Sequence, residues 1–183
     1  MAETYTVKGS SIVTKFDYAE EHFGAEARKR LEERFSDRKL LPVVPASWYP
    51  FGDYADVLES LSEMFLDGDL SRLDDVGSYS ARRSLSGIYQ SFVISNEQNF
   101  LDFLGRISAL HGMFYSHGNL QVKVRDDGKG CSLWHRDKPE VRACDLYVAQ
   151  GFYKEAARLH GIDNIQCTFE REDGAVRFDL RWD

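Results

Sequence analysis

The sequence has little cysteine, little proline and no excess of positive charge. Its three cysteines, Cys131, Cys144 and Cys167, are spread over a chain of 183 residues. An odd number of widely spaced thiols does not suit the disulfide framework of a small secreted domain, so we expect reduced thiols. The four prolines do not mark a domain boundary, and no Ser/Gly-rich linker divides the sequence. We expect residues 1–183 to form a single domain, long enough to bury roughly 70% of its unfolded surface.

Positive charge and long apolar runs are also scarce. Lys and Arg total 23 against 30 Asp and Glu, which gives a net charge of −7. Binding to nucleic acid or to an anionic membrane by counterion release needs a basic face, which this chain does not offer in excess. No segment approaches the roughly 18 to 20 apolar residues of a membrane span, and Met1–Ser10 lacks the apolar core of a signal peptide. We expect a cytoplasmic protein with no nucleic-acid partner.

The common catalytic motifs are missing as well. The sequence has no Gly-x-Ser-x-Gly elbow, no Walker loop, no His-Glu-x-x-His and no Cys-x-x-Cys. Gly128-Lys129-Gly130 superficially resembles a phosphate loop, but predicted strands flank it, and a hairpin has no helix N-terminus to bind an anion. These absences predict that the chain is not an enzyme.

Two kinds of metal site can be weighed from the sequence. Cys131, His135, Cys144 and Cys167 are residue types that bind zinc, but Cys131 and His135 would lie roughly 13 Å apart along an extended strand. Buried thiols also serve as small core residues. His111, near the end of an apolar helix, suits a proximal haem ligand, or else simply interacts with the terminal carbonyls. We expect no cofactor, neither haem nor zinc.

The first 115 residues have the apolar period of helices. Ser10 or Ser11 caps a predicted helix that ends at Phe23 before Gly24. The prolines of Lys39–Phe51 predict an extended segment. The other predicted helices are Glu26–Phe35, one that Asp53 opens, Leu70–Phe92 with a break near Gly77, and Glu97–Met113 with Asn96 as its cap.

From Leu120 onward the apolar period changes from 3.6 to 2. Leu120–Val124 and Cys131–His135 form one predicted hairpin, and Ile165–Phe169 and Val176–Trp182 form another around an Asp173-Gly174 turn. Between them, Asp137 and Pro139 open a helix over Glu140–His160. The expected fold class is therefore α+β, an α/β sandwich in which an N-terminal helical half packs on a C-terminal antiparallel sheet of two hairpins with an intervening helix.

Aromatic residues make up 13% of the chain. Much of this content is accounted for by an aromatic core. Tyr and Trp combine an apolar ring with one polar group at its edge, so they are also enriched in ligand pockets and at dimer faces. The candidate ligand-binding residues are Trp48, Tyr49, Phe51, Tyr89, Phe92, Phe100, Phe103 and Tyr115.

The order of these features resembles a family of myxobacterial-type proteins of unknown function. The likeness rests on Val43–Pro50 followed by Asp53-Tyr54, on Gly87–Tyr89, on the helix near Asn96, on Cys144–Gly161 with its Gly151, and on the Cys167–Trp182 hairpin. That family is similar to a ligand-binding superfamily of nitric-oxide signalling and Golgi transport. The superfamily includes four-vinyl-reductase domains, haem nitric-oxide-binding domains and transport-particle subunits.

The resemblance implies an α/β sandwich, frequent homodimers and a hydrophobic cavity for a small molecule, an acyl chain or haem. The haem branch has a Tyr-x-Ser-x-Arg triad after its proximal histidine, but Tyr115-Ser116-His117 follows His111 here and no such triad occurs. The four-vinyl-reductase branch often closes with two cysteines; Cys167 resembles the first, and Val176 stands near the second. Cys144 resembles a zinc ligand of a branch that senses aromatic compounds, but with one thiol replaced by valine the zinc is not carried over.

These features together predict a noncatalytic domain that binds an apolar small molecule or an acyl chain and signals through a homodimer or a partner protein. A cavity of at least about 300 Å³ is the structural requirement. A protein-interaction scaffold with a filled pocket is the first alternative, with an exposed apolar face around Trp48–Tyr54 as its mark. A haem-based gas sensor is the second alternative.

Overall fold

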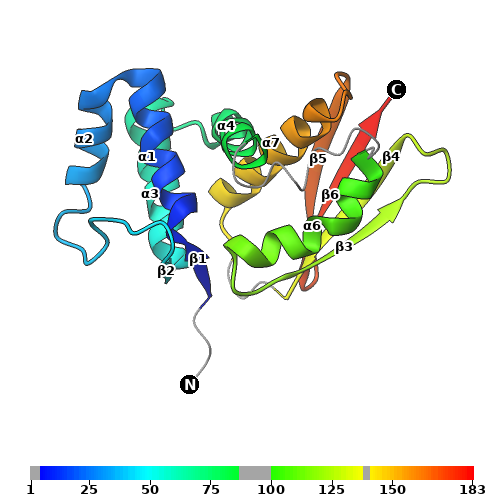
Figure 1. The fold of residues 1–183 in the computed structure, drawn as a ribbon, viewed down its shortest axis with the longest axis horizontal. Coiled ribbons are helices and arrows are strands. Elements are labelled where there is room, and N and C mark those ends of the chain that lie inside the picture. Colours follow the sequence, from blue (N-terminus) through cyan, green and yellow to red (C-terminus); the bar gives the residue numbers. More distant parts are fainter. Residues whose placement is uncertain (1–4, 87–99, 138–140) are drawn as a thin grey trace.

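The structure, a computed structural model, describes residues 5–86, 100–137 and 141–183. Figure 1 shows the N-terminal helices on one side, a sheet on the other, and α4 and α7 between them. The helices are α1 (Gly9–Phe23), α2 (Ala25–Glu33), α3 (Phe51–Phe65), the 3₁₀ turn η1 (Leu70–Arg72), α4 (Leu73–Leu85), α6 (Phe100–Phe114) and α7 (Ala143–Leu159). The strands are β1 (Thr6–Lys8), β2 (Trp48–Pro50), β3 (Asn119–Val124), β4 (Gly130–Arg136), β5 (Ile165–Glu172) and β6 (Ala175–Trp182). The predicted α+β class is confirmed.

The helix boundaries follow local chemistry. Gly24, with φ of 90°, ends α1, because a left-handed backbone suits glycine best. The apolar stripe that predicted the third helix is buried in α3, where Val57, Leu58 and Leu61 are inaccessible to solvent. The predicted Asn96 cap of α6 lies outside the described residues. The predicted start of the next helix at Glu140 is wrong, because Val141 and Arg142 are not helical and α7 begins at Ala143.

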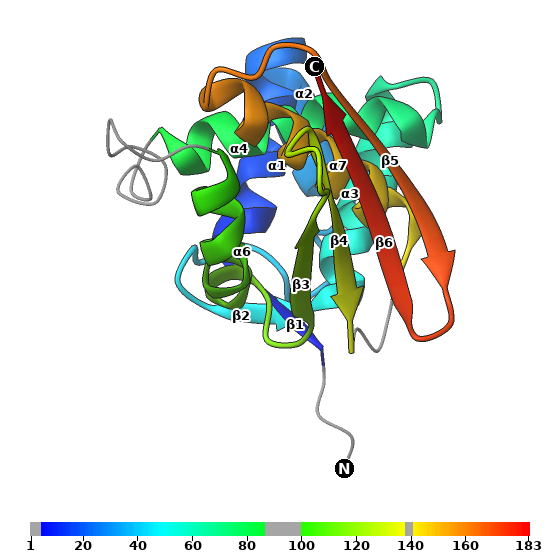
Figure 2. The same ribbon diagram turned by 90° about the vertical axis from the view of Figure 1, so that its right-hand side faces the viewer.

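Four strands form an antiparallel sheet in the order β3-β4-β6-β5. Figure 2 shows these strands side by side, with α6 beside β3. Leu133 of β4 lies opposite Phe178 of β6, and both side chains are fully buried. Most of the outward residues are polar, and Arg177 is hydrogen-bonded to Asp179 and Glu170. The sheet therefore has the one dry face that its alternating sequence predicts.

A second, two-stranded sheet joins β1 to β2 in antiparallel register, with Val7 opposite Tyr49. The sequence predicts an extended segment over Lys39–Phe51, and its Trp48–Pro50 portion is the strand β2. Its partner β1 lies within the first ten residues, where the sequence shows no strand pattern. A strand of three residues is too short for an alternation to be visible.

The buried residues fall into two apolar clusters. The first surrounds Ile12, Phe16 and Leu58, and the second lies between the sheet and the helices α6 and α7. Both α4 and α7 contribute to each cluster, with Val76 in the first and Leu85 in the second. These two helices therefore connect the N-terminal helices to the sheet.

The contact between α4 and α7 depends on two glycines. A Cβ atom on Gly77 would lie less than 3.0 Å from the carbonyl oxygen of Val148, and one on Gly151 less than 3.0 Å from that of Asp74. The sequence predicts a helix break near Gly77, and this prediction is wrong. The helix α4 continues unbroken through Gly77. The glycine does not turn the chain; its missing side chain lets the backbone of α7 approach.

We expect Gly151→Ala to destabilise the protein by about 2 kcal/mol or more, because its Cβ would meet backbone atoms that cannot rotate away. Gly105→Ala in α6 is the matched control, since no atom lies within 4 Å of the position that its Cβ would take. That control should gain up to about 1 kcal/mol from helix propensity. Urea unfolding measures both changes, and equal stability of the two variants would contradict the proposed packing.

Candidate functional site

A partly open cavity of about 370 Å³ lies between the N-terminal helices and the sheet. Its lining residues come from α1 and α4, which we call the α1 and α4 wall, from α6, which we call the α6 wall, and from α7 with β3 and β4, which we call the floor. Its volume exceeds the roughly 300 Å³ that ligand pockets need. The cavity is therefore lined by elements from both apolar clusters.

The α6 wall and the floor are largely apolar. Ile107, Leu110 and Phe114 line the cavity from α6, and Val148 and Phe152 line it from α7. These residues keep water away from whatever occupies the cavity. The α1 and α4 wall is more polar and carries the hydroxyl groups of Ser10, Ser11, Thr14, Ser80 and Ser84.

Lys15 is the cationic group buried in this wall. Its side chain is 2% exposed, and its Nζ donates a hydrogen bond of 2.7 Å to Ser80 Oγ. Burial lowers the pKa of Lys15 to about 7, and the nearby carboxylate of Asp145 partly opposes this shift. At neutral pH the amine is thus divided between its charged and neutral forms.

Asp145 and Tyr115 place further polar groups at the cavity. The carboxylate of Asp145 is 1% exposed and accepts a hydrogen bond of 3.4 Å from the hydroxyl of Tyr115. Burial, together with the neighbouring Tyr54 and Asp145, raises the pKa of Tyr115 well above its ordinary value. Tyr115 therefore stays protonated and remains a hydrogen-bond donor.

His111 lies on α6 and faces the cavity. Its ring stacks on the ring of Tyr115, with centroids 4.7 Å apart and an interplanar angle of 13°. Its Nε2 donates to the carbonyl oxygen of His117 at 3.2 Å. Histidines that bind metal ions commonly donate one ring N–H to a carbonyl, which fixes the tautomer and the orientation of the ring. The donor set at this point of the cavity thus fits an axial ligand of haem iron.

A second histidine, His135, lines the cavity from β4. Its Nε2 is hydrogen-bonded to the hydroxyl of Tyr153, and its ring meets that of His111 edge-on at 5.7 Å. Cys131, Leu133 and His135 occupy the buried, alternating positions of β4. Burial raises the pKa of Tyr153 well above its ordinary value, so this phenol also stays protonated.

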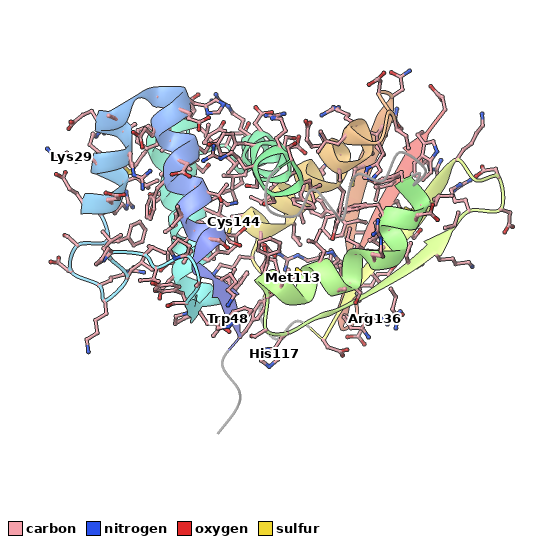
Figure 3. All side chains as sticks on the ribbon, viewed as in Figure 1. Lys29, Trp48, Met113, His117, Arg136 and Cys144 are labelled. Atoms are coloured by element: carbon pink, nitrogen blue, oxygen red, sulfur yellow. The ribbon has the colours of Figure 1, made fainter. Side chains whose placement is uncertain are left out.

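The structure places the eight sequence-predicted ligand residues in different surroundings. Tyr115 lines the cavity. Trp48 is 43% exposed at the lower edge of the molecule in Figure 3, and the Lys8 ammonium lies over its ring. Tyr49 is partly buried, and its hydroxyl accepts a hydrogen bond from the backbone N–H of Val44.

The remaining predicted residues lie away from the described cavity or outside the described residues. Phe51 is fully buried and stacks on Tyr5 with centroids 4.5 Å apart. Phe100 and Phe103 belong to α6 and pack in the second apolar cluster. Tyr89 and Phe92 lie outside the described residues. Because Phe51 and Tyr54 are buried, Trp48–Tyr54 does not form the broad apolar face expected of a scaffold.

Sequence reasoning missed Lys15, Asp145 and His135 as cavity residues. For Lys15 a signal existed, because Ile12, Lys15, Phe16 and Ala19 share the i, i+3, i+4, i+7 spacing of one buried helix face. A lysine on such a face is unusual, since buried lysines are rare.

The three cysteines are buried and reduced. Burial raises the pKa of the Cys131 and Cys144 thiols to about 12, so neither is a ready nucleophile. Cys144 lies near the centre of the molecule in Figure 3, beside Ala55 and Glu59 of α3. Within the described ranges, no three His, Cys, Asp or Glu side chains gather closely enough to hold a metal ion.

Comparison with solved structures places this fold among H-NOX domains. An H-NOX protein from S. oneidensis, in the Fe(II)NO ligation state, has a TM-score of 0.76 at 13% identity, and the match covers 96% of this chain and 99% of that one. An unliganded Fe(II) H-NOX mutant from K. algicida has a TM-score of 0.72 at 14% identity, with 96% of each chain covered. A third H-NOX structure, solved to probe haem distortion, has a TM-score of 0.70 at 11% identity, covering 96% of this chain and 94% of that one.

This chain shares the H-NOX fold. No family model and no curated protein sequence matches it. The fold that the sequence resemblance implied is therefore confirmed. None of the helices in the described part is long and apolar enough to cross a membrane.

The H-NOX comparisons correct one sequence prediction. The sequence predicts a chain without a cofactor, with haem and zinc both set aside, whereas solved proteins of this fold were studied as haem proteins with ligands on their iron. The prediction rests on the missing Tyr-x-Ser-x-Arg triad. A missing triad does not exclude haem, because an axial histidine is a separate element of haem binding.

The pKa of Lys15 leads to a prediction about stability. Its ordinary pKa of 10.5 falls to about 7 on folding, so between these pH values the unfolded chain binds more protons than the folded one. The contribution of Lys15 to the free energy of unfolding therefore rises between pH 7 and pH 10, by up to about 1.4 kcal/mol per pH unit. Lys15→Met should lack this contribution in urea unfolding measured across that range.

Lys29→Met is the matched control, because the Lys29 side chain is 65% exposed. It should keep the wild-type dependence of stability on pH. Identical slopes for wild type and Lys15→Met would contradict the lowered pKa of Lys15.

Proposed function

We propose that this chain is a noncatalytic sensor domain that binds haem in the cavity, where His111 would hold its iron. The observation that carries the proposal is the position of His111: it faces the cavity from α6, with one ring nitrogen engaged by a backbone carbonyl, in a chain with the H-NOX fold. When bound, haem supplies an iron atom that binds a small gaseous ligand.

The residues around the cavity would hold the haem and shield it from water. The stack of His111 on Tyr115 limits rotation of the imidazole, and Tyr115 is itself restrained by its hydrogen bond to Asp145. The apolar side chains of α6 and α7 exclude water from that side of the cavity. Such a dry, shaped site is what the protein contributes to the behaviour of a bound cofactor.

The position of the cavity would let a bound ligand change the structure around it. Its lining comes from α1 and α3 of the first apolar cluster and from α6, β3 and β4 of the second. A ligand that contacts both walls would favour one relative placement of the clusters over others. A homodimer or a signalling partner in the cytoplasm would receive this change, and the finer likeness to myxobacterial-type and four-vinyl-reductase proteins agrees with such a role.

Haem reconstitution tests the proposal. The purified chain should take up haem and show a Soret band, and His111→Ala should lose the band or shift it, because the axial nitrogen is gone. His22→Ala is the control, since His22 is exposed and lies outside the cavity. It should keep the wild-type spectrum.

His135→Ala separates the two cavity histidines. If this variant loses the spectrum while His111→Ala keeps it, the axial ligand is misassigned. A wild-type chain that shows no Soret band after reconstitution would overturn the proposal altogether.

A second candidate is an apolar small molecule or an acyl chain held directly in the cavity. The apolar α6 wall favours it, because ligand pockets are mostly apolar with a few polar anchors. Native mass spectrometry of the purified protein should then show a retained apolar species, and fatty acids should raise the melting temperature. A mass equal to that of the bare chain, together with an unchanged melting temperature, would remove this candidate.

A further inference from the structure

The amine of Lys15 is enclosed but only partly bonded. Its hydrogen bond to Ser80 Oγ is the one its Nζ makes within the described part of the chain, whereas an ammonium has three N–H donors. Ser80 is held in turn, because its hydroxyl donates to the carbonyl oxygen of Val76 at 2.7 Å. The amine is therefore fixed in position at the cavity with capacity for a further partner.

Anionic and aromatic groups surround this amine from other helices. Asp145 on α7 acts on Lys15 electrostatically, and the ring of Tyr54 on α3 lies 5.7 Å from its Nζ. With Ser80 on α4, these are the groups of the described residues that show a hydrogen bond, an electrostatic interaction or a ring contact with the Lys15 amine. A positive charge at this nitrogen thus has a buried counter-ion nearby.

We infer that Lys15 is a covalent attachment site for an apolar aldehyde or ketone that enters the cavity of the haem-free chain. The neutral amine adds to the carbonyl carbon, and one proton passes from its nitrogen to the carbonyl oxygen. A second proton, taken from solvent, lets that oxygen leave as water while the C=N bond forms. The product is a protonated imine, and neither an oxidant nor a reductant is consumed. The inference requires the open cavity but not haem, so it goes beyond the proposed function.

Three features of the cavity favour this chemistry. Imine formation needs a neutral amine, and burial lowers the pKa of Lys15 to about 7, which leaves much of the amine neutral at neutral pH. The iminium product keeps the positive charge that Asp145 compensates. The apolar side chains of Ile107, Leu110 and Phe114 offer a surface for the rest of the ligand.

Reductive trapping tests the inference on the wild-type chain. The haem-free protein is treated at pH 7 with octanal and sodium cyanoborohydride, and peptide mapping locates the alkyl group that the reduction makes permanent. Lys15 should be labelled about tenfold faster, or more, than the exposed Lys29, because a lowered pKa greatly enlarges its neutral fraction. The α-amino group of the chain is counted separately, since its ordinary pKa is also low.

Labelling of Lys15 no faster than that of Lys29 would overturn the inference. Lys15→Arg should lose the fast phase while keeping a positive charge. The wild-type map locates the site directly, so the result does not depend on whether that variant folds.

The pH profile of labelling and the variant Asp145→Asn test how the charge of Asp145 affects the Lys15 amine. With cyanoborohydride in excess, so that imine formation limits the rate, labelling of Lys15 should reach half of its maximum near pH 7, where labelling of exposed lysines is still far below its maximum. Asp145→Asn should lower the midpoint for Lys15, because it removes the negative charge that raises this pKa. An unchanged midpoint would overturn the role of Asp145 as counter-ion.

A haem-loaded sample separates this inference from the proposed function. Haem in the cavity should protect Lys15 from octanal. Fast labelling of Lys15 in both samples would support the inference and place haem outside this cavity. A Soret band that depends on His111, combined with an unreactive Lys15 in the haem-free chain, would support the function and overturn the inference.

Discussion

The close approach of α4 and α7 is the constraint on which the rest of the structure depends. Gly77 and Gly151 let the two backbones pass at a distance that no side chain would allow. Because both helices contribute to both apolar clusters, this contact fixes how the N-terminal helices stand relative to the sheet. The cavity lies between these two parts, so its shape is a consequence of the same contact.

The cavity combines two kinds of surface with different energetic origins. Its α6 side is apolar and is stabilised by removal of carbon surface from water. The rest of its lining includes a lysine on α1 and an aspartate on α7 that are almost fully buried, and burial of charge is unfavourable unless a partner and hydrogen bonds compensate it. A chain that retains such a pair gives up stability there, which is typical of a functional site rather than of plain core.

The elements themselves were largely predictable. The stripes of α1, α3 and α6 and the two hairpins follow from residue spacing, because the period of an amphipathic helix or strand is a local property of the chain. Gly77 marks the limit of residue spacing: the sequence predicts a break there, because it does not show that another helix packs against this glycine. The aromatic residues show the same limit, because periodicity marks Phe100 and Phe103 as buried without saying whether they face a core or a cavity.

The sequence by itself determined the α+β class and the order of the helices and of the two hairpins. Only the tertiary structure decided which residues meet at the cavity. Lys15, His111, His135 and Asp145 come from four different elements, and their proximity depends on contacts between residues far apart in the chain. The same packing of distant segments lowers the pKa of Lys15, because the pKa of a side chain responds to the water and charge around it, and these are set by the fold.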